Sequence, residues 1–466
     1  NKAFTEMYKE YGGYKTSDMP TATLNVSPRV GFNWDVMGDR SVVLRGGSGI
    51  YTGRLPFVWL VSVAGNSNCL QAQFNSTKGG ELPEGFGFNT NINDILTELY
   101  GGAFKAGDLS APSSATILDK DLKMPTTWKT SIAADFDLPF GIKGSLEGIY
   151  NKDLVSVAVT KTGLDENTKR LPGEPVDRTS YTKNANIKQN AYLITNEGID
   201  KQGYYASLTA TLKKDFNFGL SLYGAYTYSV SKNVIDGIGD QVTSAFNTNT
   251  YGVNGSNSHE LGYSSYVAPH RLVLNANYRF EYGKGKFATT VGLFYEGYNF
   301  AYVGGYSYTR SSYTLNSNVN GDGGANSLMY IPTEKELEAM PFKDEDNKAA
   351  FNEFIAGDKY LSQHRGEYSE RGAIVMPWFS QLNFKINQDI NFVVAGKKQT
   401  VQLGLDIKNL GNLINPAWGN IQQWGSNSVL TLKNDEYTFN ADQAKWSTYS
   451  GTMSTWSMLL SARYFF

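Results

Sequence analysis

The connections between strand-like segments constrain this chain more than any other feature, because short and long connections alternate along its whole length. Short turns join the strand-like segments in five pairs: 29–36 with 41–51, 128–136 with 142–150, 204–212 with 218–228, 271–280 with 287–298, and 378–388 with 400–409. Long stretches rich in Gly, Ser and Asn lie between the pairs, at 52–127, 160–202, 229–270, 304–377 and 410–455. Soluble domains rarely contain structureless loops beyond about 12 to 15 residues, whereas outer-membrane barrels combine short periplasmic turns with long extracellular loops. The pattern therefore predicts an all-β, transmembrane antiparallel β-barrel.

The last segment shows the residue alternation that such a wall requires. One set of alternate positions is apolar and has aromatic residues at both ends: Trp456, Met458, Leu460, Ala462, Tyr464 and Phe466. The other set holds Ser457, Leu459, Ser461, Arg463 and Phe465. Successive side chains of a strand point to opposite faces, so we expect the first set to face lipid and Arg463 to face the lumen.

Five strand pairs and one final strand give about eleven strands, an odd number that cannot close a single-chain bacterial barrel. A comparable number supplied by missing N-terminal sequence would give about 22, the size of plugged outer-membrane transporters. We therefore expect residues 1–466 to be the C-terminal part of such a barrel. The final strand runs from a long loop, so its end should be periplasmic.

Composition excludes several classes. No run of about 18 apolar residues is present, which excludes a helical membrane protein. The net charge is −2 and the basic residues are scattered, so no nucleic-acid partner is expected.

Cys69 is the only cysteine, and the three histidines, His259, His270 and His364, lie far apart without acidic neighbours at metal spacing. We expect no metal, no cofactor and no catalytic site, and hence no enzyme. The chain opens at Asn1 without a signal peptide, which indicates a mature or truncated chain.

Two local motifs lie in the long loop at 304–377. Asn318, Asn320, Asp322 and Gly323 resemble the start of a calcium-binding loop, but position twelve is Met329, so ordinary turns are the better interpretation. Within 332–357, Thr333 and Glu336 match a capping box, and an apolar stripe predicts a helix over the barrel mouth. The stripe contains Ala349, Phe351, Phe354 and Ile355.

The chain end carries a further motif. Phe466, with Tyr464, Ala462 and Leu460 at alternate positions, resembles the C-terminal insertion signal that the barrel-assembly machinery of the outer membrane reads. A strand of this kind can pair through its backbone with another sheet edge while the barrel is incomplete.

Several segments resemble TonB-dependent transporters, most closely the Oar-like branch, whose members carry a carboxypeptidase-regulatory-like domain near the N-terminus. Among them are HRLVLNANYRF from His270, FATTVGLFYEGY from Phe287 and VQLGLDIKNLGNLINPAWG from Val401. The resemblance implies a 22-stranded barrel in the cell outer membrane, filled by an N-terminal plug. A TonB box would engage the energy-transducing complex of the inner membrane. Neither plug nor TonB box is among these residues.

The resemblance implies a transporter that binds its substrate at the cell surface and imports it with energy from the inner membrane. A passive porin, or a structural or docking barrel in an outer-membrane assembly, is the alternative. The expected partners are outer-membrane lipids, the TonB complex through the missing N-terminal part, the barrel-assembly machinery and a surface lipoprotein. The substrate stays open. We expect the long loops to select it, with Trp59, Trp418, Trp424 and Trp446 either stacking on ligand or pinning loops together.

Overall fold

The structure is a computed structural model, and it describes residues 13–66, 86–87, 89–100, 115–187, 190–236, 241–248, 250–324 and 326–466. Cys69 lies outside these residues. None of the helices among them is both long and apolar enough to cross a membrane.

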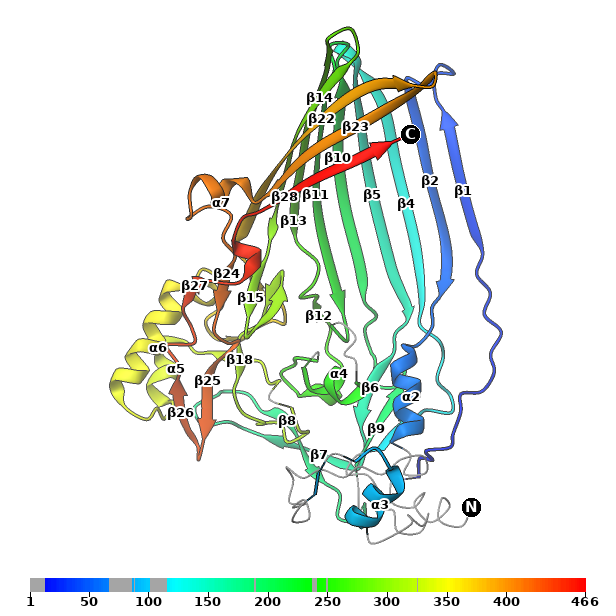
Figure 1. Ribbon diagram of the computed structural model, residues 1–466. Coiled ribbons are helices and arrows are strands. Elements are labelled where there is room, and N and C mark those ends of the chain that lie inside the picture. Colours follow the sequence, from blue (N-terminus) through cyan, green and yellow to red (C-terminus); the bar gives the residue numbers. More distant parts are fainter. Residues whose placement is uncertain are drawn as a thin grey trace.

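One antiparallel sheet forms the main body of the molecule and carries eleven strands in chain order, with a short twelfth strand attached to its side (Figure 1). The strands are β1 (Arg29–Asp35), β2 (Val42–Thr52), β4 (Thr126–Leu138), β5 (Ile142–Val155), β10 (Tyr204–Asp215), β11 (Leu220–Asn233), β13 (His270–Tyr282), β14 (Phe287–Asn299), β22 (Trp378–Val394), β23 (Lys397–Lys408) and β28 (Ser457–Phe465). The twelfth, β12 (Gly262–Tyr263), pairs with β11. All eleven segments expected from the sequence are present, so this part of the prediction is confirmed.

The sheet is open. Among the described residues, β1 pairs only with β2 and β28 pairs only with β23, so the two outermost edges have no strand partner. The closed 22-stranded barrel therefore stays a prediction.

The short turns all lie at one end of the sheet, with the C-terminus, and the long connections gather at the other end (Figure 1). The turn after β22 is shorter than the sequence suggested: β22 and β23 extend to a two-residue connection, Ala395 and Gly396, both at positive φ. Two residues with φ above zero match the twist of the flanking strands, which explains why pairing continues to the tip.

The long connections are folded, not structureless. Their strands are β3 (Ala115–Leu118), β6 (Ala158–Lys161), β7 (Leu164–Lys169), β8 (Arg178–Lys183), β9 (Ala191–Thr195), β15 (Ala301–Val303), β16 (Tyr306–Tyr308), β17 (Arg310–Ser311), β18 (Thr314–Leu315), β19 (Tyr330–Ile331), β20 (Glu367–Tyr368), β21 (Ile374–Val375), β24 (Gln422–Trp424), β25 (Ser428–Lys433), β26 (Glu436–Phe439) and β27 (Trp446–Thr448). Their helices are α2 (Phe57–Gly65), α3 (Ile92–Tyr100), α4 (Val242–Thr248), α5 (Glu334–Ala339), α6 (Glu345–Gly357) and α7 (Leu410–Ile414). Together these elements form what we call the loop assembly.

Most of the buried apolar residues lie in the loop assembly. Its largest cluster joins different loops, from Leu171 through Tyr313 and Phe351 to Trp424 and Tyr437. A second cluster packs α2 and α4 against β3, β6 and β9. Because these contacts join segments far apart in sequence, the loops form packed units of their own.

The predicted helix at 332–357 is present as two helices, α5 and α6. Thr333 and Glu336 form the expected capping box at the start of α5, and Asp344 caps α6. Pro341 lies in the connection between them, which accounts for the break. Phe351 and Ile355 are fully buried, whereas Ala349 is exposed, so the predicted stripe was wrong at that position.

Candidate functional site

The strand register gives the large sheet two chemically different faces. In β23 and β28, Leu403 pairs with Ala462 and Leu405 with Leu460, all on what we call the apolar face. Gln402 pairs with Arg463 on the other side, the polar face. The alternation predicted for the last strand agrees with this register.

The ion pairs of the barrel strands lie on the polar face. The shortest pairs between different barrel strands join β2 to β4, β13 to β14, β13 to β22 and β22 to β23: Arg45 with Asp135 at 2.7 Å, Arg271 with Glu296 at 2.5 Å, Arg279 with Asp389 at 2.8 Å, and Lys385 with Asp406 at 3.1 Å. Such a wall suits contact with water or polar solutes.

Aromatic rings gather at both ends of the apolar face. Near the short turns, Tyr278, Phe280 and Tyr282 stack in succession, with centroids 5.3 and 5.8 Å apart. Near the loop assembly, Tyr150 contacts Trp128 at 6.0 Å and Tyr204 at 6.5 Å. Rings at these two levels with aliphatic residues between them are the expected pattern of a membrane-facing surface.

The C-terminal residues predicted as an insertion signal lie together on β28 and just after it. Leu460 is 79% exposed and Phe466 is 94% exposed, while the rings of Tyr464 and Phe466 stack at 5.9 Å. Ala462 is exposed beside them. Their role as a signal stays a prediction.

The calcium-like motif joins loops. The Oδ1 atom of Asn318 accepts the backbone N–H groups of Gly321 and Gly323, and the Oδ2 atom of Asp322 accepts the N–H of Ser256 at 2.5 Å. Asn320 donates to the carbonyls of Thr179 and Val253. These oxygens are used as acceptors for protein donors, in agreement with the interpretation as turns.

Two buried polar clusters hold the loop assembly together. The guanidinium of Arg178 donates two 2.8 Å bonds to Glu174, both groups being 1% exposed, and a third to the carbonyl of Leu328. Asp322 and Lys161 form a second cluster, in which Lys161 donates to the Asp322 carbonyl at 2.8 Å. Burial raises the pKa of the Asp322 carboxyl and lowers the pKa of the Lys161 ammonium.

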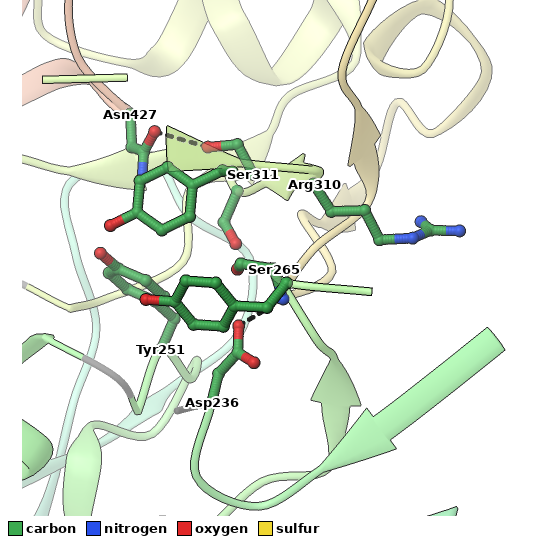
Figure 2. Close-up of a pocket in the computed structure, with 9 residues that line it drawn as sticks. Asp236, Tyr251, Ser265, Arg310, Ser311 and Asn427 are labelled. Carbon is green, nitrogen blue, oxygen red and sulfur yellow. Dashed lines mark hydrogen bonds between the residues drawn. The ribbon is translucent and has the colours of Figure 1, made fainter. Parts of the chain in front are cut away.

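A small enclosed cavity lies where three long loops meet (Figure 2). Asp236 accepts the backbone N–H of Ser265 at 2.5 Å, and Ser311 donates to Asn427 at 2.5 Å across the cavity wall. The remaining lining residues are Tyr251, Tyr266, Tyr308, Arg310 and Ser312. Its volume of about 10 Å³ suits one water molecule, so it serves packing of the loops and offers no room for a substrate.

The three histidines form different hydrogen bonds. His259 is buried, its Nε2 lies 2.8 Å from the Thr160 hydroxyl, and burial lowers the pKa of its imidazole to about 4. His270 bonds the Tyr226 hydroxyl, and His364 the carbonyl of Tyr360. Among the residues that the structure describes, no group of three His, Cys, Asp or Glu is placed to hold a metal ion.

The four loop tryptophans divide into two kinds. Trp59 and Trp424 are buried in the clusters of the loop assembly, so they pin loops together. Trp418 and Trp446 are exposed, and Trp446 contacts Trp424 at 5.3 Å. Only the exposed pair offers ring surface to a ligand.

A cleft lies on the polar face, between β13, β14, β22 and β23. This cleft has a volume of about 320 Å³ and lies beside the Lys385–Asp406 pair. Residues of the polar face that line it are Asn275, Asn277, Gly292, Phe294, Asn383, Lys385, Asp406 and Lys408. Sequence reasoning missed it, because alternation gives the face of each residue but not which residues become neighbours across four strands.

A twisted antiparallel sheet with an aromatic-bordered apolar face and an ion-paired polar face defines a membrane β-barrel wall. The sequence agrees: residues 4–429 match the family model described as outer membrane beta barrel domain, and the chain belongs to that family. It is therefore a protein of the outer membrane.

Solved structures of outer-membrane proteins are similar to the chain at low identity. The outer membrane transporter YddB of Escherichia coli matches with a TM-score of 0.42 and 10% identity over 94% of this chain and 41% of that one. A mutant of the ferric enterobactin receptor PfeA of Pseudomonas aeruginosa matches with a TM-score of 0.41 and 9% identity over 94% of this chain and 40% of that one. The siderophore receptor PirA of Acinetobacter baumannii matches with a TM-score of 0.35 and 11% identity over 83% of this chain and 37% of that one. The chain thus spans about two fifths of the length of these structures. No curated protein matches it.

Proposed function

We propose that the chain forms the C-terminal half of the barrel of a TonB-dependent outer-membrane transporter. The transporter binds a substrate at the cell surface and imports it with energy from the inner membrane. The observation that carries the proposal is the open sheet, whose two outer edges at β1 and β28 have no partner among the described residues. In a membrane every backbone N–H and C=O must be paired, so these edges require further strands. Eleven more strands would give a barrel of about 22, the size that encloses a plug.

Membership of an outer-membrane barrel family and the polar wall support the same proposal. Ion pairs such as Arg45–Asp135 and Arg279–Asp389 line the lumen and suit a path for polar solutes or contact with a plug. The loop assembly at the other end from the short turns would then face the cell exterior, and Phe466 the periplasm. Packed loops of this kind can form a surface that receives a substrate before it enters the lumen.

The test uses the protein from the complete reading frame, including whatever precedes Asn1. We expect the upstream sequence to encode a plug and a TonB box. The purified protein should bind the periplasmic domain of TonB in a pull-down, and a variant without the TonB box should not. In a planar lipid bilayer the protein should give no steady conductance, because a plug closes the periplasmic part of the lumen. Steady conductance together with no binding of TonB would contradict the proposal and indicate a porin.

A further inference from the structure

A glycine in the polar-face cleft makes room for a neighbouring amide. Gly292 lies on β14 between Asn277 of β13 and Lys385 of β22. A Cβ atom at Gly292 would lie 2.7 Å from the Oδ1 atom of Asn277, closer than atoms normally approach. Without a side chain at Gly292, the Asn277 amide can lie against β14 and form part of the lining of the cleft, the hollow between β13, β14, β22 and β23.

An aromatic ring and several amides line this hollow. Phe294 lies in register with Asn275 on one side and Asn383 on the other, so its half-buried ring has a carboxamide on each flank. Asn277 donates to Asn275, and the Oδ1 atom of Asn383 accepts the backbone N–H of Asn409 at 2.9 Å. These bonds fix the amide planes beside the ring, so a ligand meets donors and acceptors that are already oriented.

The charges at the cleft are nearly balanced. Lys385 is paired with Asp406 at 3.1 Å, and Lys408 adds one further cation to the lining. A strongly anionic ligand would need a cluster of unpaired cations, and a strongly cationic one would need unpaired carboxylates. The lining instead suits a neutral ligand that has many hydroxyl groups and at least one apolar face.

A second group of rings continues along the same face toward the loop assembly. Tyr298 lies four residues after Phe294 on β14, about 14 Å away at 3.4 Å per residue. Its ring contacts Phe300 at 5.4 Å and Phe379 at 5.8 Å. Glu296, which pairs with Arg271, lies between the two ring sites on β14. Two platforms with hydrogen-bonding groups between them fit an extended ligand better than a single small molecule.

We propose that the cleft around Phe294 is a binding site on the lumen wall for a neutral oligosaccharide. The sugar ring would stack its apolar C–H face on Phe294, and its hydroxyl groups would bond the amides of Asn275, Asn277 and Asn383 and the Lys385–Asp406 pair. Such a site favours a ligand with hydroxyl groups that match the amides. A ligand without them would displace water and leave the amides without hydrogen-bond partners, which costs binding free energy. The inference rests on the proposed function, because it takes the cleft to lie on the substrate path.

The test measures binding, not transport. Full-length protein in detergent is titrated by calorimetry with neutral hexasaccharides of glucose, mannose, galactose and N-acetylglucosamine, and with hexagalacturonate as an acidic probe. At least one neutral probe should bind, and Phe294→Ala should weaken it tenfold or more. The matched control is Tyr205→Ala, because Tyr205 is an aromatic residue of the polar face on β10, two strands away from β13. The affinity of the Tyr205→Ala variant for the same probe should differ from that of the wild-type protein by less than twofold.

Heat-modifiable migration on a denaturing gel checks that both variants form compact barrels. If Phe294→Ala does not, Asn277→Ala replaces it, with at least a threefold loss expected. Binding of no neutral probe by compact wild-type protein would overturn the proposal, as would equal affinities of the site and control variants or tighter binding of hexagalacturonate. The titration needs neither TonB nor an energised membrane. Failure of TonB binding with intact sugar binding would therefore refute the transporter proposal alone.

Discussion

The two faces of β28 make a matched pair of substitutions possible at adjacent residues. Leu460 lies on the apolar face opposite Leu405, and Leu459 lies on the polar face opposite Asp406. Both are exposed, at 79% and 62%. Arginine at 460 would place a charge in lipid, whereas arginine at 459 would place it in the lumen near a carboxylate.

The depth of Leu460 sets the size of the effect. It lies four residues from Trp456 and six from Phe466, and these aromatic residues bracket the apolar set of the strand. With 3.4 Å per residue and a tilt of about 40°, Leu460 is about 10 Å below the first ring and about 15 Å from the second. This position is close to the bilayer midplane, where arginine costs about 2 to 4 kcal/mol. We expect about 3 kcal/mol for Leu460→Arg and less than about 1 kcal/mol for Leu459→Arg, since a partly exposed ion pair contributes little.

The assay is reversible unfolding of the complete protein in lipid vesicles by guanidinium, followed by tryptophan fluorescence. The difference between the two variants is the measured quantity, because effects on the unfolded chain are nearly the same for neighbouring residues. Equal losses for both variants, or a larger loss for Leu459→Arg, would show that the assignment of faces is wrong.

Three further predictions concern the loops and the chain end. The pKa of His259 is lowered to about 4 in the folded loops, so as pH falls the imidazole is protonated in the unfolded loops before it is protonated in the folded ones. The free energy of unfolding of the loop assembly should therefore fall by up to about 3 kcal/mol between pH 6.5 and pH 4. Hydrogen exchange of loop amides measures this loss, and an unchanged pH slope in His259→Gln would contradict it. Arg178→Met leaves the Glu174 carboxylate buried without its partner and should destabilise the loops by about 3 to 5 kcal/mol in the same exchange experiment, whereas adding Glu174→Gln should restore part of the loss. If Phe466 belongs to an insertion signal, Phe466→Ala should lower the yield of barrel in the outer membrane severalfold, and Phe465→Ala, on the other face, should not; equal yields would sink this prediction.

The large sheet was predictable because its information is local. In the last strand, Leu460 and Arg463 differ in polarity at positions of opposite parity, and a period of two fixes which face each side chain takes. The capping box at Thr333 is similarly contained in four residues. In such segments the sequence pattern alone specifies the local structure.

The loop assembly was not predictable, because its contacts join distant residues. The hydroxyl of Thr160 meets His259, and Tyr368 donates to Glu174, 194 residues earlier in the chain. Nothing in the neighbourhood of either residue reveals its partner. The motif at 318–323 illustrates the consequence: its sequence matches ordinary turns and gives no sign of burial, yet Asn320 and Asp322 are each 1% exposed. Deleting it would disrupt packing and would not isolate a recognition role.

The contacts between loops also bear on the order of folding. Each long connection starts and ends in the main sheet, so its ends are brought together only when the neighbouring strands have paired. The bond from Lys161 to Asp322 closes a span of 161 residues, and such distant closures carry a large entropic cost until the intervening strands are in place. The loop assembly should therefore be the last part of the molecule to reach its native arrangement. Until then Arg178, Glu174 and His259, which are buried in the folded loops, are exposed to water. If the loop assembly faces the cell exterior as proposed, the loops would therefore cross the membrane in this hydrated, unfolded form.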